Sequence, residues 1–256
     1  MGVSTQPDHQ WIDLDGTVNA RTVAAGVLLR SDNLQELTAL DVARLIEDHG
    51  LEVVIDLRTE VEVWMEGPTR LADEGSVRIE YHSLYPAADR DSDLDASTIQ
   101  IWGAPMEGEF ADEAPVVRAY LSYMARRPDS IVSAVSAIAR ADGAVLVHCA
   151  AGKDRTGLVV ALALEAVGVE RSVVVADYVA TAQRIEQVMA RLLSSSTYRA
   201  ELEGHNLFDH TPQAQMMERV LEILDSQSGG AAAWLMQRGL SSTDLERLRE
   251  RLTPRP

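Results

Sequence analysis

One short stretch of the chain gathers the residue types best suited to nucleophilic chemistry. The chain has a single cysteine, Cys149, and a single lysine, Lys153, whereas its other 22 basic side chains (23 − 1) are arginines. An apolar run at 144–148 precedes the cysteine, and a helix-like segment opens at Thr156. A buried strand, a tight loop and a helix N-terminus together direct backbone N–H groups toward an anion. The sequence therefore predicts an anion-binding loop with a thiol at its start.

The chemistry expected of such a loop is attack of a thiolate on phosphorus. Backbone dipoles and a nearby guanidinium favour the thiolate of Cys149, which is the reactive form. The attack gives a phosphocysteine and splits one difficult step into two. Arg155 would clamp the equatorial phosphate oxygens, where the charge of the transition state develops. We therefore predict Cys149 as the nucleophile and Arg155 as the phosphate clamp.

The other residues of the stretch have supporting roles in this interpretation. The backbone of the small residues would approach the phosphate closely, and Gly152 can adopt a positive φ. Lys153, a compact point charge, suits a further anionic group of the substrate. Thr156 can donate its hydroxyl to the cysteine sulfur and ease its departure, and His148 would orient the loop. The predicted substrate-binding residues are Ala150, Ala151, Gly152, Lys153 and Thr156.

Cleavage of a phosphate ester also needs a proton for the leaving oxygen. Among the candidate acids, Asp154 is the one within the predicted phosphate-binding loop, and a bound dianion would keep it protonated. The neighbouring cations oppose that effect, so a structural role in which Asp154 accepts from loop N–H groups stays open. Asp56 and the aspartates of residues 83–114 are the other candidates for the acid. For Asp56 and Arg58 we favour a role in tying a strand end to the loop.

The elements that must position these residues alternate between strands and helices. Short apolar runs predict strands at 27–30, 51–57, 77–82 and 144–148. Helices are expected at 34–49, at 116–141 with a break at Pro128, at 156–167, at 170–193, from 211 to 224, and after Ser241. This order indicates an α/β fold: one domain over residues 1–256, with a mostly parallel central sheet flanked by helices and a helical C-terminal third. Residues 83–114 are acidic and rich in Pro and Gly, and read either as a solvated insertion or as a lid over the site.

The string His-Cys-Ala-Ala-Gly-Lys-Asp-Arg-Thr-Gly at 148–157 resembles the signature loop of bacterial protein tyrosine phosphatases of the mycobacterial phosphatase B type. Similar segments occur at 26–32, at 54–58 with Glu60 or Glu62, at Asp177-Tyr178 and at Gly239-Leu240. The family's N-terminal Asn-Phe-Arg-Asp-Leu-Gly-Gly pattern is matched only by residues 11–16, without its arginine. The resemblance implies a phosphatase of broad specificity, with Lys153 and Asp154 linked to that breadth and a helical lid at 83–123.

Composition narrows the partners and the compartment. The formal net charge of −17 disfavours nucleic acid, whose phosphates require basic side chains, and stable association with anionic membranes. We find no 18-residue apolar run and no secretory signal, so a cytoplasmic location is expected, with export lacking a signal still possible. One cysteine excludes an internal disulfide framework. The six histidines lack metal-ligand spacing, and we predict neither metal nor cofactor.

Three functions remain open on the sequence alone. A protein tyrosine phosphatase is favoured, with phosphotyrosine proteins as substrates. A phosphoinositide or inositol-phosphate phosphatase is the second reading, supported by Lys153. A phosphate-binding pseudophosphatase is the third, although a binding module would have no need of the thiol at Cys149.

Overall fold

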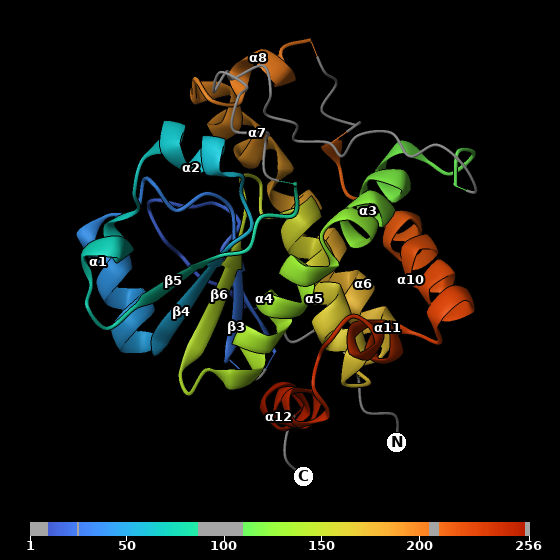
Figure 1. The fold of residues 1–256 in the computed structure, drawn as a ribbon. Helices are drawn as coiled ribbons and strands as arrows, with labels where there is room; N and C mark the ends of the chain where they lie inside the picture. Colours follow the sequence, from blue (N-terminus) through green and yellow to red (C-terminus); the bar gives the residue numbers. More distant parts are fainter. Residues whose placement is uncertain (1–9, 25, 87–109, 205–209, 254–256) are drawn as a thin grey trace, which may run out of the picture.

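A six-stranded mixed sheet, ordered β1-β2-β3-β6-β4-β5, forms the centre of the computed structural model, which describes residues 10–24, 26–86, 110–204 and 210–253 (Figure 1). The strands from β3 to β5 run parallel, while β1 and β2 add an antiparallel edge. This confirms the predicted α/β class with a mostly parallel sheet. The strands are β1 (Gln10–Trp11), β2 (Arg21–Ala24), β3 (Leu28–Ser31), β4 (Leu51–Asp56), β5 (Arg78–Tyr81) and β6 (Ala144–His148).

Helices cover both faces of the sheet and its carboxyl edge. Alternate residues of the central strands enter different cores: Val53 and Val145 join the larger one, and Val54 and Leu146 the smaller. In Figure 1 α4, α5 and α6 lie on one side of the sheet and α1 on the other, while α2, α7 and α8 lie beyond the ends of the parallel strands. The α-helices are α1 (Ala39–Ala43), α2 (Glu60–Glu66), α3 (Pro115–Arg126), α4 (Pro128–Arg140), α5 (Asp154–Ala166), α6 (Arg171–Ala180), α7 (Ile185–Ser194), α8 (Arg199–Leu202), α10 (Ala214–Ser228), α11 (Ala231–Gln237) and α12 (Ser242–Leu252).

The register of the parallel strands brings three strand ends together. His148, the last residue of β6, pairs with Ser31 at the end of β3 and with Asp56 at the end of β4. The backbone N–H of Leu57 then donates to the His148 carbonyl at 3.0 Å. Because parallel strands end at the same edge, the loop after β6 emerges between the segments that follow β3 and β4.

Several predicted helix limits are wrong, each for a local reason. Thr38 caps α1 in a capping box with Asp41, so the helix expected from residue 34 starts five residues later and continues as one π-helical turn, Arg44–Asp48. A 3-10 turn at Thr181–Arg184 separates α6 from α7. Gln213, not Thr211, precedes the first residue of α10. The break at Pro128 is confirmed, since α3 ends at Arg126 and α4 begins at Pro128.

The segment predicted as a lid, residues 83–123, falls in large part on 87–109, outside the described residues. Its described flanks are residues 83–86 and 110–123, and the second contains the first turns of α3. Within the described ranges, no helix combines the length and the apolar character needed to cross a bilayer.

Candidate active site

The loop from Cys149 to Lys153 joins the end of β6 to the start of α5 and is buried along its whole length. Its carbonyl groups are bound by donors from three other segments. The Asn33 backbone N–H donates to the Ala150 carbonyl at 3.0 Å, and the Asn19 side-chain amide donates to the Ala151 carbonyl at 3.0 Å. Arg30 donates to the Gly152 carbonyl at 2.7 Å. None of these bonds uses an N–H group of the loop, and backbone N–H groups at the N-terminus of a helix such as α5 are suited to an anion.

Gly152 is required by the close approach of this loop to β3. Its φ is +64°, in the left-handed region that glycine occupies without strain. A Cβ at this position would lie 2.3 Å from the Ser31 carbonyl oxygen. The loop conformation therefore depends on glycine both for its backbone angle and for its contact with the end of β3.

A buried cluster of two arginines and Asp177 anchors the loop to α6. Arg21 Nε donates to Asp177 Oδ1 at 2.9 Å, and Arg30 Nη1 pairs with Asp177 Oδ2. Burial raises the pKa of Asp177, but Arg30 and Arg21 outweigh it and lower that pKa overall. Arg21 also donates to the Asn19 side-chain oxygen at 2.6 Å. Both donors that hold the Ala151 and Gly152 carbonyls are thus fixed by one carboxylate network.

Arg155 is held by a two-point ion pair with Glu62 of α2. Nη1 donates to Glu62 Oε2 at 2.7 Å, and Nη2 donates to Oε1 at 2.8 Å, with both side chains buried. Glu62 is itself fixed, because its carboxylate accepts the Thr59 backbone N–H in the capping box of α2. The pair leaves the Nε–H and one Nη2–H of the guanidinium without a hydrogen bond to any described residue. These two donors form a fork that matches two oxygens of a phosphate.

Asp56, Arg58 and His148 connect the ends of β4 and β6. Arg58 donates to Asp56 through Nε at 2.9 Å and Nη2 at 2.6 Å, and its Nη1 reaches the Asn33 side-chain oxygen at 3.1 Å. Burial raises the pKa of Asp56, but His148 and Arg58 bring it to about 2. His148 Nδ1 lies 3.3 Å from the Cys149 carbonyl, and its Nε2 lies 3.5 Å from Asp56 Oδ2. This geometry supports the predicted roles of these residues in tying the strand ends to the loop.

Stability should fall in acid because of His148. Burial lowers the pKa of His148 to about 4, whereas an unfolded histidine titrates near 6.5. As the pH falls from about 6.5 to about 4, the unfolded chain binds a proton on this histidine that the folded chain does not bind. This difference lowers the free energy of unfolding by roughly 3 kcal/mol. Urea unfolding between pH 7 and pH 4 should therefore show a shallower loss for His148→Asn, which keeps an N–H donor, than for the wild type. Parallel curves for the two proteins would contradict this assignment.

Asp154 is bound on one carboxylate oxygen by two donors. Tyr120 of α3 donates its hydroxyl to Oδ1 at 2.8 Å, and Lys153 Nζ donates to the same oxygen at 3.0 Å. Burial raises the pKa of Tyr120 well above its usual value, so its hydroxyl keeps its proton. The Tyr178 hydroxyl lies 2.9 Å from that of Tyr120. Both bonds to Asp154 use Oδ1, and no described residue forms a hydrogen bond to Oδ2.

Residues 13–254 match the model of a family described as the tyrosine phosphatase family. The chain belongs to this family. It is 30% identical to the triple specificity protein phosphatase PtpB of Mycobacterium tuberculosis, over 93% of this chain and 97% of PtpB. It is 28% identical to a tyrosine-protein phosphatase of Nostoc commune, over 91% of this chain and 76% of the relative. A solved structure of P. aeruginosa TpbA in complex with pTyr aligns over 85% of this chain and 98% of TpbA, with a TM-score of 0.39 and 13% identity.

The phosphatase carries site residues that the sequence interpretation missed. The family's N-terminal Asn-x-Arg pattern is predicted at residues 11–16, but Asn19 is the residue that donates to the loop, and Arg21 donates to the Asn19 side-chain oxygen. Asn19-Ala20-Arg21 has the same spacing, so the signal was present further along the chain. Tyr120 had no such signal, because only the fold brings α3 to Asp154. Glu62 was one of two candidates in its segment, and its pairing with Arg155 distinguishes it from Glu60.

One further expectation can be compared with the geometry of this phosphatase site. The Thr156 hydroxyl is buried and has no hydrogen-bond partner among the described residues, so the predicted bond to the Cys149 sulfur is not made in this structure. No group of three or more His, Cys, Asp or Glu side chains suited to a metal ion occurs in the described part of the chain.

Proposed function

We propose that this phosphatase hydrolyses phosphotyrosine, with Cys149 as nucleophile and Arg155 as phosphate clamp. The observation that carries the proposal is the juxtaposition of one buried thiol, a loop with its carbonyls engaged outward, and a guanidinium held in place by Glu62. Two relatives support it, since one is named a triple specificity protein phosphatase and the other a tyrosine-protein phosphatase.

The reaction would proceed in two displacements at phosphorus. The thiolate of Cys149 forms a P–S bond while the bond to the phenolic oxygen breaks, and Asp154 transfers a proton from Oδ2 to that oxygen. Water then attacks phosphorus, the P–S bond breaks, Asp154 recovers a proton, and inorganic phosphate leaves. The loop N–H groups and the free fork of Arg155 stabilise the equatorial oxygens in both steps.

The proton transfer from Asp154 predicts a dependence on the leaving group. An activated aryl phosphate needs little help from an acid, whereas a poor leaving group needs a full proton. Asp154→Asn should therefore slow an alkyl or unactivated phenyl phosphate about tenfold or more beyond its effect on a nitrophenyl phosphate. Steady-state kcat values over a series of leaving groups test this. An equal loss over the whole series would assign Asp154 a structural role.

Phosphoinositide hydrolysis is the second candidate, and Lys153 is the observation that favours it. Its ammonium group is buried beside Asp154 at the edge of the loop, where it can pair with a further phosphate of the substrate. The deciding experiment compares kcat/KM for a phosphotyrosine peptide, a phosphoserine peptide and a soluble phosphoinositide headgroup, all in EDTA. We expect the phosphotyrosine peptide to lead by at least about tenfold. A higher kcat/KM for the headgroup than for the phosphotyrosine peptide, lost in Lys153→Gln, would instead identify a phosphoinositide phosphatase.

A cytoplasmic location, expected from the sequence, belongs to the same proposal. Fractionation of the native cells tests it, and recovery of the phosphatase mainly in the medium would overturn it.

A further inference from the structure

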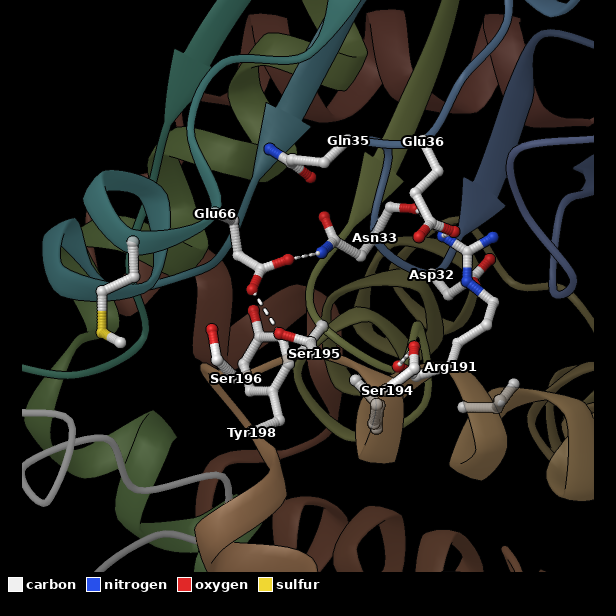
Figure 2. Close-up of a pocket in the computed structure, with 14 residues that line it drawn as sticks. Asp32, Asn33, Gln35, Glu36, Glu66, Arg191, Ser194, Ser195, Ser196 and Tyr198 are labelled. Carbon is white, nitrogen blue, oxygen red and sulfur yellow. Dashed lines mark hydrogen bonds and ion pairs between the residues drawn. The ribbon is translucent and has the colours of Figure 1, made fainter.

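A polar pocket of about 370 Å³ lies next to the loop that follows β6 (Figure 2). Its walls come from the segment after β3, the end of α2 and the chain from α7 to α8. Ala150, the residue directly after Cys149, forms part of its lining. The pocket therefore borders the place where a phosphate would bind, although none of the predicted catalytic side chains lines it.

Negative charge predominates in this pocket. Three carboxylates line it, from Asp32, Glu36 and Glu66, against the single guanidinium of Arg191. Arg191 is already paired, since Nε lies 3.3 Å from Asp32 and Nη2 lies 3.2 Å from Glu36. With Arg191 and Asp32 taken as one pair, Glu36 and Glu66 leave an excess of negative charge.

Unused hydrogen-bonding capacity coincides with that charge. Glu66 accepts from the Asn33 amide at 2.7 Å and from the Ser195 hydroxyl at 2.6 Å, and each oxygen keeps a further lone pair. The Tyr198 side chain is fully buried, and its hydroxyl has no hydrogen-bond partner among the described residues. Gln35 Oε1 is also buried and has no hydrogen-bond partner among the described residues. In Figure 2 the Tyr198 hydroxyl points toward the Glu66 carboxylate, in the middle of the labelled side chains.

Such a set of groups calls for a ligand that is cationic and rich in donors. The described residues hold no group of three ligating side chains suited to a metal ion, which favours an organic cation. A guanidinium offers five N–H donors in a planar fork, whereas an ammonium offers three around a point. Met65, Val188 and Leu192 give the pocket an apolar wall on which an aliphatic stem can lie.

We propose that this pocket binds an arginine side chain that flanks the phosphotyrosine of a peptide substrate. The inference rests on the proposed function, because the occupant is defined as part of a phosphotyrosine substrate. Glu66 would receive the guanidinium, Glu36 would add charge at the rim, and Tyr198 and Gln35 would gain the partners that they lack. The phosphatase would then select substrates by a basic residue at a fixed distance from the phosphorylated one.

The experiment uses a set of phosphotyrosine peptides in which one residue, from four positions before the phosphotyrosine to four after, is arginine or its neutral isostere citrulline. For the wild type we expect the arginine peptide to exceed the citrulline peptide in kcat/KM by about fivefold or more, at one position or two adjacent ones. Glu66→Gln should bring that ratio close to one, and Glu36→Gln, at a more exposed side chain, should lower it in part. Because each ratio is taken within one variant, a general loss of activity does not imitate the effect.

The net charge of the chain supplies the main competing explanation. A protein with a formal charge of −17 attracts any cationic peptide, but that attraction depends on salt and not on the position of the arginine. Glu47→Gln, at an exposed carboxylate of the π-helical turn outside the pocket, is the matched control and should keep the wild-type ratio. Equal ratios at all positions, or a ratio that Glu66→Gln leaves intact, would overturn the proposal that the pocket binds arginine, even though the peptides are hydrolysed. No hydrolysis of any phosphotyrosine peptide would instead overturn the proposed function, and with it this occupant.

Discussion

Cys149→Ser will lose phosphatase activity by at least about four orders of magnitude, because a serine hydroxyl does not ionise at neutral pH and the covalent step disappears. The variant should still bind inorganic phosphate, since the loop N–H groups and the Arg155 fork remain. The substituted side chain is small, buried and 2% exposed, so the fold should persist. Phosphate release from a phosphotyrosine peptide in EDTA, together with calorimetry of phosphate binding, measures both expectations.

The two readouts separate chemistry from binding. Residual turnover in Cys149→Ser at a tenth or more of the wild-type rate would contradict a thiolate nucleophile. An inactive wild type that still binds phosphate would favour a binding module, which was the third reading of the sequence. Activity that EDTA abolishes in the wild type would point to a metal-dependent reaction in place of this one.

Glu62→Gln will lower both stability and turnover. Removal of one charge from a buried ion pair leaves Arg155 without its counter-ion, and such changes cost roughly 3–5 kcal/mol. Glu62 also fixes the direction of the guanidinium fork, so kcat should fall by about one to two orders of magnitude as the clamp loses its alignment. Urea unfolding and steady-state kinetics on an aryl phosphate give the two magnitudes.

Glu60→Gln is the matched control for this variant. Glu60 lies in the same first turn of α2, but its side chain is exposed and forms no hydrogen bond or ion pair with Arg155. It should change stability by less than about 0.5 kcal/mol. If Glu62→Gln behaves like Glu60→Gln in both assays, the ion pair neither stabilises the loop nor aligns the clamp.

The parts of this structure that sequence reasoning predicts well are those encoded by neighbouring residues. The strand Ala144–His148 matches its predicted limits, because four apolar residues and His148 end at a loop of small residues. The helix after it begins at Asp154, two residues earlier than expected, where Lys153 takes the capping position. A local pattern therefore placed Cys149 in the loop after the strand and Arg155 in the first turn of the helix, where the structure has them.

The parts that sequence reasoning missed depend on contacts between distant segments. Arg21 reaches Asp177 across 156 residues, and Tyr120 reaches Asp154 across 34. No local periodicity encodes such pairs, because they exist only once the sheet has set its strand order. Asp32 shows the same limit, because its carboxylate accepts the backbone N–H of Asn19 at 3.0 Å from a separate segment.

The single buried cysteine also allows the unmodified protein to be labelled at one known position. Since Cys149 is the one thiol in the sequence, any thiol-directed label reports on the loop at 149–153 alone. Moles of iodoacetamide incorporated per mole of chain then count the molecules with an intact Cys149 thiol, as a titration of the proposed active site in the unmodified protein. The degree to which a bound anion protects Cys149 from labelling gives the fraction of loops that hold the anion, without any turnover assay.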